Sequence, residues 1–260
     1  MLFPLFDHNP TKRFPILTIL LIVANVAVFL HCQALTQSDL RDLMVTRGFV
    51  PKRFSHLNEP KPVEIIVTDH KQQRFGYQLP VDTASVYGTL FSMMFLHGGW
   101  VHLITNMWML WVFGNNIEDR LGHITYIGFY VMGGLSAIFA QWIIDPESMR
   151  PVIGASGAVW AVLGGYAVTY PWARVKSLVF ILLLEVPALL VIAFFFCLDL
   201  IMAISGIAGA QQHAVAHWAH LGGCAAGVTL MPLLAFGASP PDADWRSEGE
   251  ALLVVDQPMK

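Results

Sequence analysis

A serine and a histidine in otherwise apolar surroundings are the residues of this chain best suited to chemistry. Ser156 lies in the segment Gly154-Ala155-Ser156-Gly157, and His220 lies in a later apolar stretch. A serine hydroxyl is a weak nucleophile until a base within hydrogen-bond reach accepts its proton, and a histidine with a pKa near neutrality is the usual base. We therefore predict that Ser156 is a nucleophile and that His220 is its general base.

His102 and Asn106 are candidates for stabilising the charge that such a reaction creates. A carbonyl under attack becomes an oxyanion, and one preorganised donor to it is worth about 3 kcal/mol in a soluble protease. The two residues are four positions apart, which places them on one face of a helix, one turn from each other. The backbone N–H groups at the start of the helix near Ser156 are expected to add to the same oxyanion hole.

His217 competes with His220 for the role of base. The two residues are three positions apart and lie on neighbouring parts of one helical face. His220 follows His213 by seven residues, so it lies about 10 Å below the start of the span at 1.5 Å per residue. We favour His220 because it is one turn deeper than His217 and directly precedes a glycine-lined stretch.

Metal binding is the alternative for the histidines. His97, His102, His217 and His220 could supply imidazole ligands, but the chain has no HExxH motif and no carboxylate among these positions. We therefore expect no metal and no cofactor.

Two carboxylates, Glu185 and Asp199, fall within a predicted membrane span. They lie about four helical turns apart, which is too far for a proton relay. We interpret both residues as helix-interface or loop-edge positions.

The composition is that of a chain dissolved in lipid. Hydrophobic residues make up 55% and charged residues 13% of the 260 residues, whereas soluble domains usually carry about a quarter charged residues. The formal net charge of -3 gives no indication of a nucleic-acid partner. The cysteines have no paired spacing, so neither a disulfide framework nor a zinc ribbon is indicated: Cys32, Cys197 and Cys224.

Six apolar stretches are long enough to cross a bilayer, which takes about 20 residues. They are residues 14–35, 97–115, 122–144, 154–171, 177–204 and 214–236. The first is too long for a signal-peptide core and ends without a cleavage site, so we expect it to be retained. The sequence thus predicts an all-α polytopic membrane protein with six transmembrane helices.

Basic residues beside these spans predict their orientation. Lys12 and Arg13 precede the first span, and Arg174 and Lys176 follow the fourth. By the positive-inside rule these segments are cytoplasmic, and with six spans both termini are cytoplasmic. The second, fourth and sixth spans then all begin at the extracytoplasmic face, which brings the candidate residues to one depth.

This orientation divides the chain into three parts. Residues 1–13 form a cytoplasmic N-terminus, residues 14–236 the membrane domain, and residues 237–260 a solvated cytoplasmic tail. The long segment 36–96 is expected outside, because long loops are largely exempt from the charge rule. Within it, residues 63–67 and 73–79 are predicted to pair as a hairpin.

The motifs together resemble the rhomboid intramembrane serine proteases. The matching segments are residues 97–106 (HGGWVHLITN), 118–120 (EDR), 154–157 (GASG) and 219–223 (AHLGG) with Gly227. The resemblance spans about residues 14–236. GxSG alone is a weak signal, but its combination with HxxxN and AHxxGxxxG is specific.

The resemblance implies a role for each matching residue of the centre. Ser156 corresponds to the nucleophile and His220 to the general base, without a carboxylate as a third member. His102 and Asn106 correspond to the oxyanion-stabilising pair.

The resemblance also implies supporting roles. Gly157 and Gly223 match positions of close helix contact, and His97 matches a structural histidine near the first extracytoplasmic loop. Glu118 and Arg120 match a structural pair at the cytoplasmic end of the second span. The full supporting set is Gly154, Gly157, Gly223, Gly227, His97, Glu118 and Arg120.

The function implied is that of a serine endopeptidase that cleaves single-span transmembrane substrates near the extracytoplasmic side. The lipid bilayer is the other expected partner, and a bacterial inner membrane is the expected location. The chain departs from many relatives by having Tyr87-Gly88 in place of a Trp-Arg pair, and its first loop is enlarged by residues 59–85. A non-catalytic membrane binder or chaperone of helices is the alternative, and a transporter fits poorly because the polar cluster is one-sided.

Overall fold

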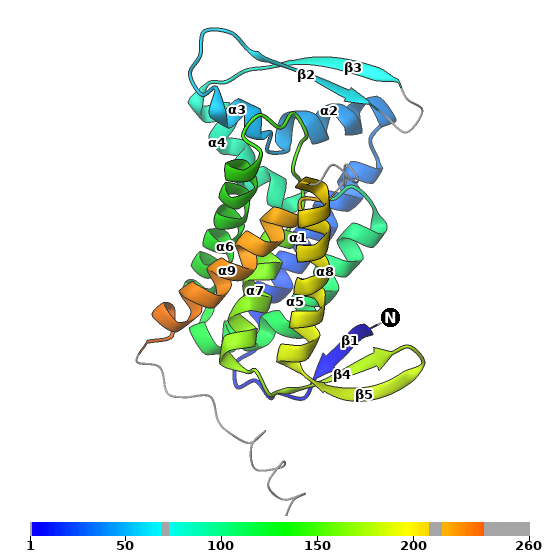
Figure 1. Cartoon of the computed structure of the whole chain (residues 1–260), viewed down its shortest axis with the longest axis vertical. Helices are drawn as coiled ribbons and strands as arrows, with labels where there is room; N and C mark the ends of the chain where they lie inside the picture. Colours follow the sequence, from blue (N-terminus) through cyan, green and yellow to red (C-terminus); the bar gives the residue numbers. More distant parts are fainter. Residues whose placement is uncertain (1, 69–72, 208–214, 237–260) are drawn as a thin grey trace, which may run out of the picture.

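The computed structural model of this chain describes residues 2–68, 73–207 and 215–236. Most of these residues are helical, and a bundle of long helices forms the body of the molecule (Figure 1). The bundle helices are α1 (Ile16–Gln33), α5 (Trp100–Leu121), α6 (His123–Ile144), α7 (Ser156–Thr169), α8 (Ala188–Ile207) and α9 (His217–Leu234). Successive helices of this set run in opposite directions, so that α5, α7 and α9 begin at the same end of the bundle.

Three of the described helices are long and apolar enough to cross a membrane. They lie at Ile16–Gln33, His123–Ile144 and Ala188–Gly206, and α7 is a shorter apolar helix. The chain is therefore an integral membrane protein. The predicted count of six spans is supported only in part by these helices.

Helix α7 lies at the centre of the bundle, in contact with α5, α6, α8 and α9. Its residues 157–166 are all buried, which explains how a helix of 14 residues can be this apolar without facing lipid along its length. The largest core cluster surrounds it and includes Phe113, Tyr126, Phe129 and Tyr166. The packing around α7 fixes the position of Ser156, its first residue.

The start of the predicted fifth span is not helical. Residues 177–187 fall in a hairpin of two antiparallel strands, β4 (Arg174–Val179) and β5 (Leu182–Pro187), and α8 begins only after Pro187. A short apolar run can form a strand as well as a helix, and a proline marks the boundary because it lacks a backbone N–H. The all-α prediction is corrected here.

The N-terminal residues also form a strand, which completes this sheet. Strand β1 (Leu2–Asp7) pairs antiparallel with β4, so the strand order is β1-β4-β5. The indole of Trp108 on α5 donates a hydrogen bond to the carbonyl oxygen of Pro4 at 2.6 Å. The predicted cytoplasmic N-terminus is thus packed against the bundle at the end opposite α2 (Gln37–Arg47) and α3 (Pro51–Ser55) (Figure 1).

Asp7 connects this sheet to two bundle helices. Its Oδ2 accepts hydrogen bonds from Asn116 Nδ2 of α5 at 2.6 Å and from the Tyr166 hydroxyl of α7 at 2.7 Å. Burial raises the pKa of Asp7 to about 6, against an ordinary value of 3.8, although the bond from Tyr166 opposes that shift. The folded protein therefore holds a proton on Asp7 more tightly than the unfolded chain does.

This raised pKa predicts a pH-dependent stability. Since the folded state binds the proton more tightly, stability should fall as the pH rises from about 4 to about 7 and the folded carboxyl ionises. Stability measured by thermal unfolding in detergent should fall over this pH range in the wild type and should not fall in Asp7→Asn. Glu64→Gln, at an exposed carboxylate of the predicted hairpin at residues 63–79, is the control and should keep the slope. An unchanged slope in Asp7→Asn would contradict the assignment.

The long segment after α1 folds as a small unit at the other end of the bundle. It contains α2 (Gln37–Arg47), α3 (Pro51–Ser55), β2 (Val63–Thr68), β3 (Arg74–Leu79), α4 (Thr83–Ser92) and the 3-10 helix η1 (Met93–Phe95). The predicted hairpin is confirmed, since β2 and β3 pair with Val63 opposite Leu79. A separate apolar core holds the unit together: Val45, Val50, Val63, Ile65, Leu79 and Val81.

Glu118 fixes the beginning of α1 against α5. The fully buried carboxylate accepts hydrogen bonds from the backbone N–H groups of Leu17 and Thr18 at 2.9 and 2.8 Å and from the Thr18 hydroxyl at 2.7 Å. His123 Nδ1 lies 2.6 Å from the same carboxylate. The start of a helix leaves such N–H groups unpaired and favours negative charge. Glu118 therefore joins three helices, whereas its predicted pairing with Arg120 stays a prediction.

Candidate active site

The predicted nucleophile lies on the wall of an open cavity at the end of the bundle that faces the α2–α4 unit. The cavity has a volume of about 1370 Å³ and is lined by residues of α5, α6, α7, α8 and α9. Among its lining residues are His102, Asn106, Ser156, His217 and His220. The beginnings of α5, α7 and α9 thus contribute to one cavity, as their parallel orientation requires.

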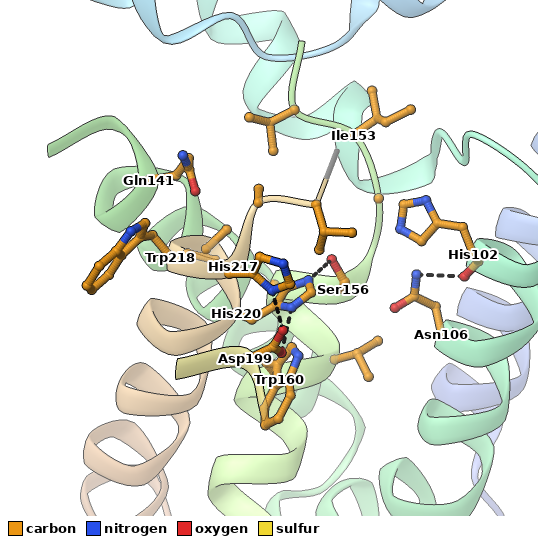
Figure 2. A pocket seen from close by; sticks show the side chains of 18 of the residues that line it. His102, Asn106, Gln141, Ile153, Ser156, Trp160, Asp199, His217, Trp218 and His220 are labelled. Atoms are coloured by element: carbon orange, nitrogen blue, oxygen red, sulfur yellow. Dashed lines mark hydrogen bonds and ion pairs between the residues drawn. The ribbon is translucent and has the colours of Figure 1, made fainter. Parts of the chain in front are cut away.

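Ser156 and His220 are within hydrogen-bond distance of each other. His220 Nε2 lies 2.8 Å from Ser156 Oγ (Figure 2). The indole of Trp160, one turn after Ser156 on α7, stacks on the His220 ring with centroids 5.9 Å apart and planes 29° apart. Trp160 was not predicted to lie at the site, although its i, i+4 spacing from Ser156 could have indicated it.

Glycines allow α7 and α9 to approach this closely. A Cβ added to Gly223 would lie 2.1 Å from the carbonyl oxygen of Gly157, and one added to Gly227 would lie 2.0 Å from that of Ala161. On the other side of α7, a Cβ on Gly157 itself would lie 2.4 Å from the Cβ of Ala137 on α6. The distance between Ser156 and His220 therefore depends on positions where no side chain fits.

The segment before Ser156 passes directly beside His102. Gly154 has a φ of +123°, a conformation that residues with a side chain rarely adopt. A Cβ at this glycine would lie 2.7 Å from His102 Nε2 and 3.6 Å from Ser156 Oγ. The space next to Gly154 is therefore bordered by both the predicted nucleophile and a ring nitrogen of His102.

Asn106 is turned towards its own helix. Its Nδ2 donates a hydrogen bond to the backbone carbonyl of His102 at 2.9 Å (Figure 2). The amide nitrogen carries two protons, and this bond uses one of them. The structure brings Asn106 into the cavity but does not aim its amide at Ser156.

His97 lies behind His102. It is buried, and its ring packs edge-on against the His102 ring with centroids 5.0 Å apart. The two rings are on the α5 side of the cavity. His97 can limit the positions that the His102 ring adopts, which is compatible with the structural role implied by the resemblance.

Asp199 is a second residue, besides Trp160, that was not predicted to lie at the site. Its Oδ2 lies 2.8 Å from His220 Nδ1, and its Oδ1 lies 2.5 Å from His217 Nδ1 (Figure 2). The interpretation of Asp199 as a helix-interface or loop-edge position was incomplete, and the statement that no carboxylate lies among the histidines was wrong. Glu185 is in β5, where it pairs with Arg174.

Two signals in the sequence could have identified Asp199. An ionisable residue in an apolar span is a functional candidate by default, and α8 is the most hydrophobic of the three candidate spans. Helix α8 also runs opposite to α7 and α9, so a residue towards its C-terminal end reaches the face where those helices begin.

The same three side chains are the group in the described residues that could hold a metal ion. One ligand atom from each of Asp199, His217 and His220 lies within 4.8 Å of the others. A metal ion held by these residues would compete with the hydrogen bonds between the two histidines and the carboxylate. Of the four histidines considered as ligands from the sequence, His97 and His102 lie outside this group.

Comparison with known proteins decides the family. The Rhomboid domain model matches residues 84–236, which is more than half of the chain. The chain belongs to the rhomboid family. The matched region of this rhomboid protein begins in α4 and includes Ser156, His220, Asp199 and the residues around them.

Relatives in the rhomboid family include proteins of plants, animals and parasites. The chain is 29% identical over 159 residues to Rhomboid-like protein 11, chloroplastic, of Arabidopsis thaliana, covering 58% of this chain and 54% of the relative. It is 29% identical over 166 residues to Rhomboid-like protease 5 of Toxoplasma gondii, covering 57% of this chain and 17% of the relative.

A third rhomboid relative carries a mitochondrial name. The chain is 30% identical over 82 residues to Presenilin-associated rhomboid-like protein A, mitochondrial, of Danio rerio, covering 31% of this chain and 21% of the relative. The match spans 54% or less of the length of each of these three proteins. Their names include a mitochondrial and a chloroplastic protein, so the predicted bacterial inner membrane has no support from them.

Proposed function

We propose that this rhomboid protein is an intramembrane serine endopeptidase that cleaves single-span transmembrane proteins near the extracytoplasmic side. The observation that carries the proposal is the 2.8 Å distance between His220 Nε2 and Ser156 Oγ. The hydroxyl and the imidazole face an open cavity, where a substrate carbonyl and water can reach both. Membership of a family with protease members supports the same conclusion.

The proposed reaction proceeds through an acyl-enzyme. His220 accepts the Ser156 proton at Nε2 as Oγ attacks the substrate carbonyl carbon, and the carbonyl oxygen becomes an oxyanion. The peptide C–N bond then breaks, and the imidazolium gives its proton to the leaving amine. Water, deprotonated by His220, attacks the ester and releases the second product with Ser156 restored. The protons and electrons balance with the substrate, one water molecule, Ser156 and His220 alone.

The oxyanion would lie in the space bordered by Gly154, His102 and Ser156. Of the side-chain nitrogens, His102 Nε2 lies nearest to the position beside Gly154. The N–H groups at the start of α7 add backbone donors. Asn106 would contribute after a rotation that frees its amide from the His102 carbonyl. These donors stabilise charge that exists only in the transition state.

This assignment predicts a selective loss of rate in His102→Ala. We expect kcat to fall by about 10² to 10³, with KM changed little, because an oxyanion donor acts on the transition state and not on bound substrate. Steady-state cleavage in proteoliposomes measures both constants. Thr229→Ala is the control, since Thr229 of α9 is absent from the cavity lining and its hydroxyl bonds the carbonyls of Ala225 and Ala226 in its own helix. A kcat loss below about tenfold would argue against the role.

The cavity supports a transmembrane helix as the substrate. Many of its lining residues are apolar, among them Met109, Leu163, Phe195 and Met202, and such walls suit an apolar peptide that unwinds at the cleavage site. The polar groups that could bind a backbone are concentrated at the end where α5, α7 and α9 begin. This distribution supports cleavage near one end of the substrate helix.

The topology is part of the proposal. We place all six bundle helices across the membrane, with residues 14–236 as the membrane domain and both termini, including residues 237–260, in the cytoplasm. The alternating directions of α1, α5, α6, α7, α8 and α9 support this arrangement. The positive residues before α1 and at the start of β4 favour the same orientation. The α2–α4 unit would then lie outside.

Reconstitution with a model substrate tests the proposal. Purified protein in liposomes, incubated with a panel of single-span proteins, should give two fragments whose new ends lie near the extracytoplasmic boundary, as mapped by mass spectrometry. The rival function is a non-catalytic binder of transmembrane helices. Stable co-purification of intact substrate with the wild-type protein, and no fragments, would favour the binder and reject the protease.

A further inference from the structure

We propose that Asp199 is a positioning residue for His220, so that the reacting pair of this protein is extended to Ser156, His220 and Asp199. The proposal rests on the function proposed above and departs from the dyad that the family resemblance implies. Three helices supply the three members: α7 the serine, α9 the histidine and α8 the carboxylate (Figure 2).

The atoms form one continuous line of hydrogen bonds. Ser156 Oγ lies 2.8 Å from His220 Nε2, and the other ring nitrogen, Nδ1, lies 2.8 Å from Asp199 Oδ2. A carboxylate can only accept at this bond, so the proton must be on Nδ1. Nε2 is then the unprotonated nitrogen, which is the tautomer that can take the Ser156 proton.

None of the other contacts described for the His220 ring selects its tautomer. Trp160 stacks on the face of the imidazole and restricts its tilt, but a stacked ring face does not choose between tautomers. Rotation of the ring within its own plane is restricted by the bonds at its two nitrogens. Asp199 is the partner that defines the nitrogen turned away from Ser156.

The carboxylate is itself held from a second side. Asp199 Oδ1 accepts a hydrogen bond from His217 Nδ1 at 2.5 Å, one turn before His220 on α9. Both oxygens therefore have histidine partners, and the side chain is only 15% exposed. Orientation of a catalytic imidazole by a carboxylate that is fixed in turn is the arrangement that keeps a base in place.

A purely structural role is the competing explanation. A carboxylate in an apolar helix needs partners, and hydrogen bonds from two histidines could serve only to join α8 to α9. In that case, removing the charge would reduce stability and leave the chemistry of the remaining folded protein unchanged. In the positioning role, it would reduce the rate of the chemical step in protein that is still folded.

The decisive comparison is Asp199→Asn against wild type in proteoliposomes. An amide can donate to Nδ1 and thereby hold the proton on Nε2, which is the wrong tautomer. We expect kcat to fall by about 10³ while KM stays within about twofold. Asp199→Glu should recover part of the rate, since it restores an acceptor. Ser205→Ala, at a serine of α8 whose hydroxyl bonds the carbonyl of Ile201, is the control on the same helix.

A spectroscopic readout separates this inference from the proposed function. A histidine N–H bound to a carboxylate gives a proton resonance far downfield, which can be recorded without any turnover. It should be present in wild type and in Ser156→Ala, and it should disappear in Asp199→Asn. Part of the signal arises from His217, and His217→Gln identifies that part. If Asp199→Asn fails to fold, the wild-type and Asp199→Glu spectra still decide, since absence of the resonance at His220 overturns the inference.

The remaining outcomes are equally decisive. If Ser156→Ala is inactive but Asp199→Asn keeps kcat within about threefold of wild type, the carboxylate is structural and the inference is wrong. If Ser156→Ala cleaves normally, the proposed function fails, whereas the resonance still reports the bond to Asp199. If a chelator abolishes wild-type cleavage, the three side chains hold a metal ion and the positioning role is rejected.

Discussion

Ser156→Ala is expected to abolish cleavage, with a loss in kcat of about 10⁴ or more. The variant lacks the oxygen that forms the acyl-enzyme, and His220 Nε2 loses the partner 2.8 Å away. The fold should survive, because alanine fits where serine did and is a better helix former. Kinetics in proteoliposomes and labelling with a serine-directed fluorophosphonate measure the loss independently of each other.

The matched control for this variant is Ser136→Ala. Ser136 lies in α6, a neighbouring helix of the bundle, and is absent from the cavity lining. It should keep both cleavage and labelling. Fluorophosphonate labelling of Ser156→Ala at the wild-type level would show that another residue is the nucleophile.

Gly227→Ala is expected to have the largest effect on folding of any single added methyl group on α9. The new Cβ would lie 2.0 Å from the carbonyl oxygen of Ala161, and its other nearest neighbours are also backbone atoms of that residue. Backbone atoms in a buried helix cannot turn aside as a side chain can, so α7 and α9 must separate. We expect the free energy of unfolding to fall by about 3 kcal/mol.

The same substitution should reduce activity in the protein that remains folded. Separation of α7 from α9 moves His220 away from Ser156, and a misplacement of about 1 Å can cost about 10²-fold in rate. Gly128→Ala is the control, because nothing lies within 4 Å of the added Cβ at this glycine of α6. Gly227→Ala should be less stable than Gly128→Ala in thermal unfolding in detergent, and its folded fraction should cleave substrate more slowly. Equal stability of Gly227→Ala and Gly128→Ala would show that the helix contact is not tight.

The sequence predicted the features of the site that depend on residues within a single helix. The spacing of His102 and Asn106 and the glycines of α7 and α9 are local patterns, and the direction of successive helices follows from counting spans. These patterns were enough to bring Ser156 and His220 to one cavity. They could not determine the rotamer of Asn106, because its bond to the His102 carbonyl competes with any partner across the cavity.

The features that were missed depend on contacts between distant segments. Asp199 reaches the site only through its contact with α9. Glu185, its nearest charged neighbour in the sequence, gave no indication of that contact. The β4–β5 hairpin was missed because its apolar residues suit a strand or a helix, and pairing with β1 selects the strand. Of the segment before α5, only the hairpin was predicted, since the small core around it joins residues that are far apart in the chain.

The bonds of Asp7 bear on how far the chain can be trimmed. Hydropathy suggests that residues ahead of α1 can be removed without harm to a membrane domain. However, Asp7 is the acceptor for Asn116 and Tyr166, which lie near the ends of α5 and α7 opposite to His102 and Ser156. A deletion of β1 would remove the carboxylate that accepts from two buried side chains in the helices that carry the site. Tolerance to truncation depends on buried hydrogen bonds, so we expect the smallest functional piece of this protein to begin before the first membrane helix.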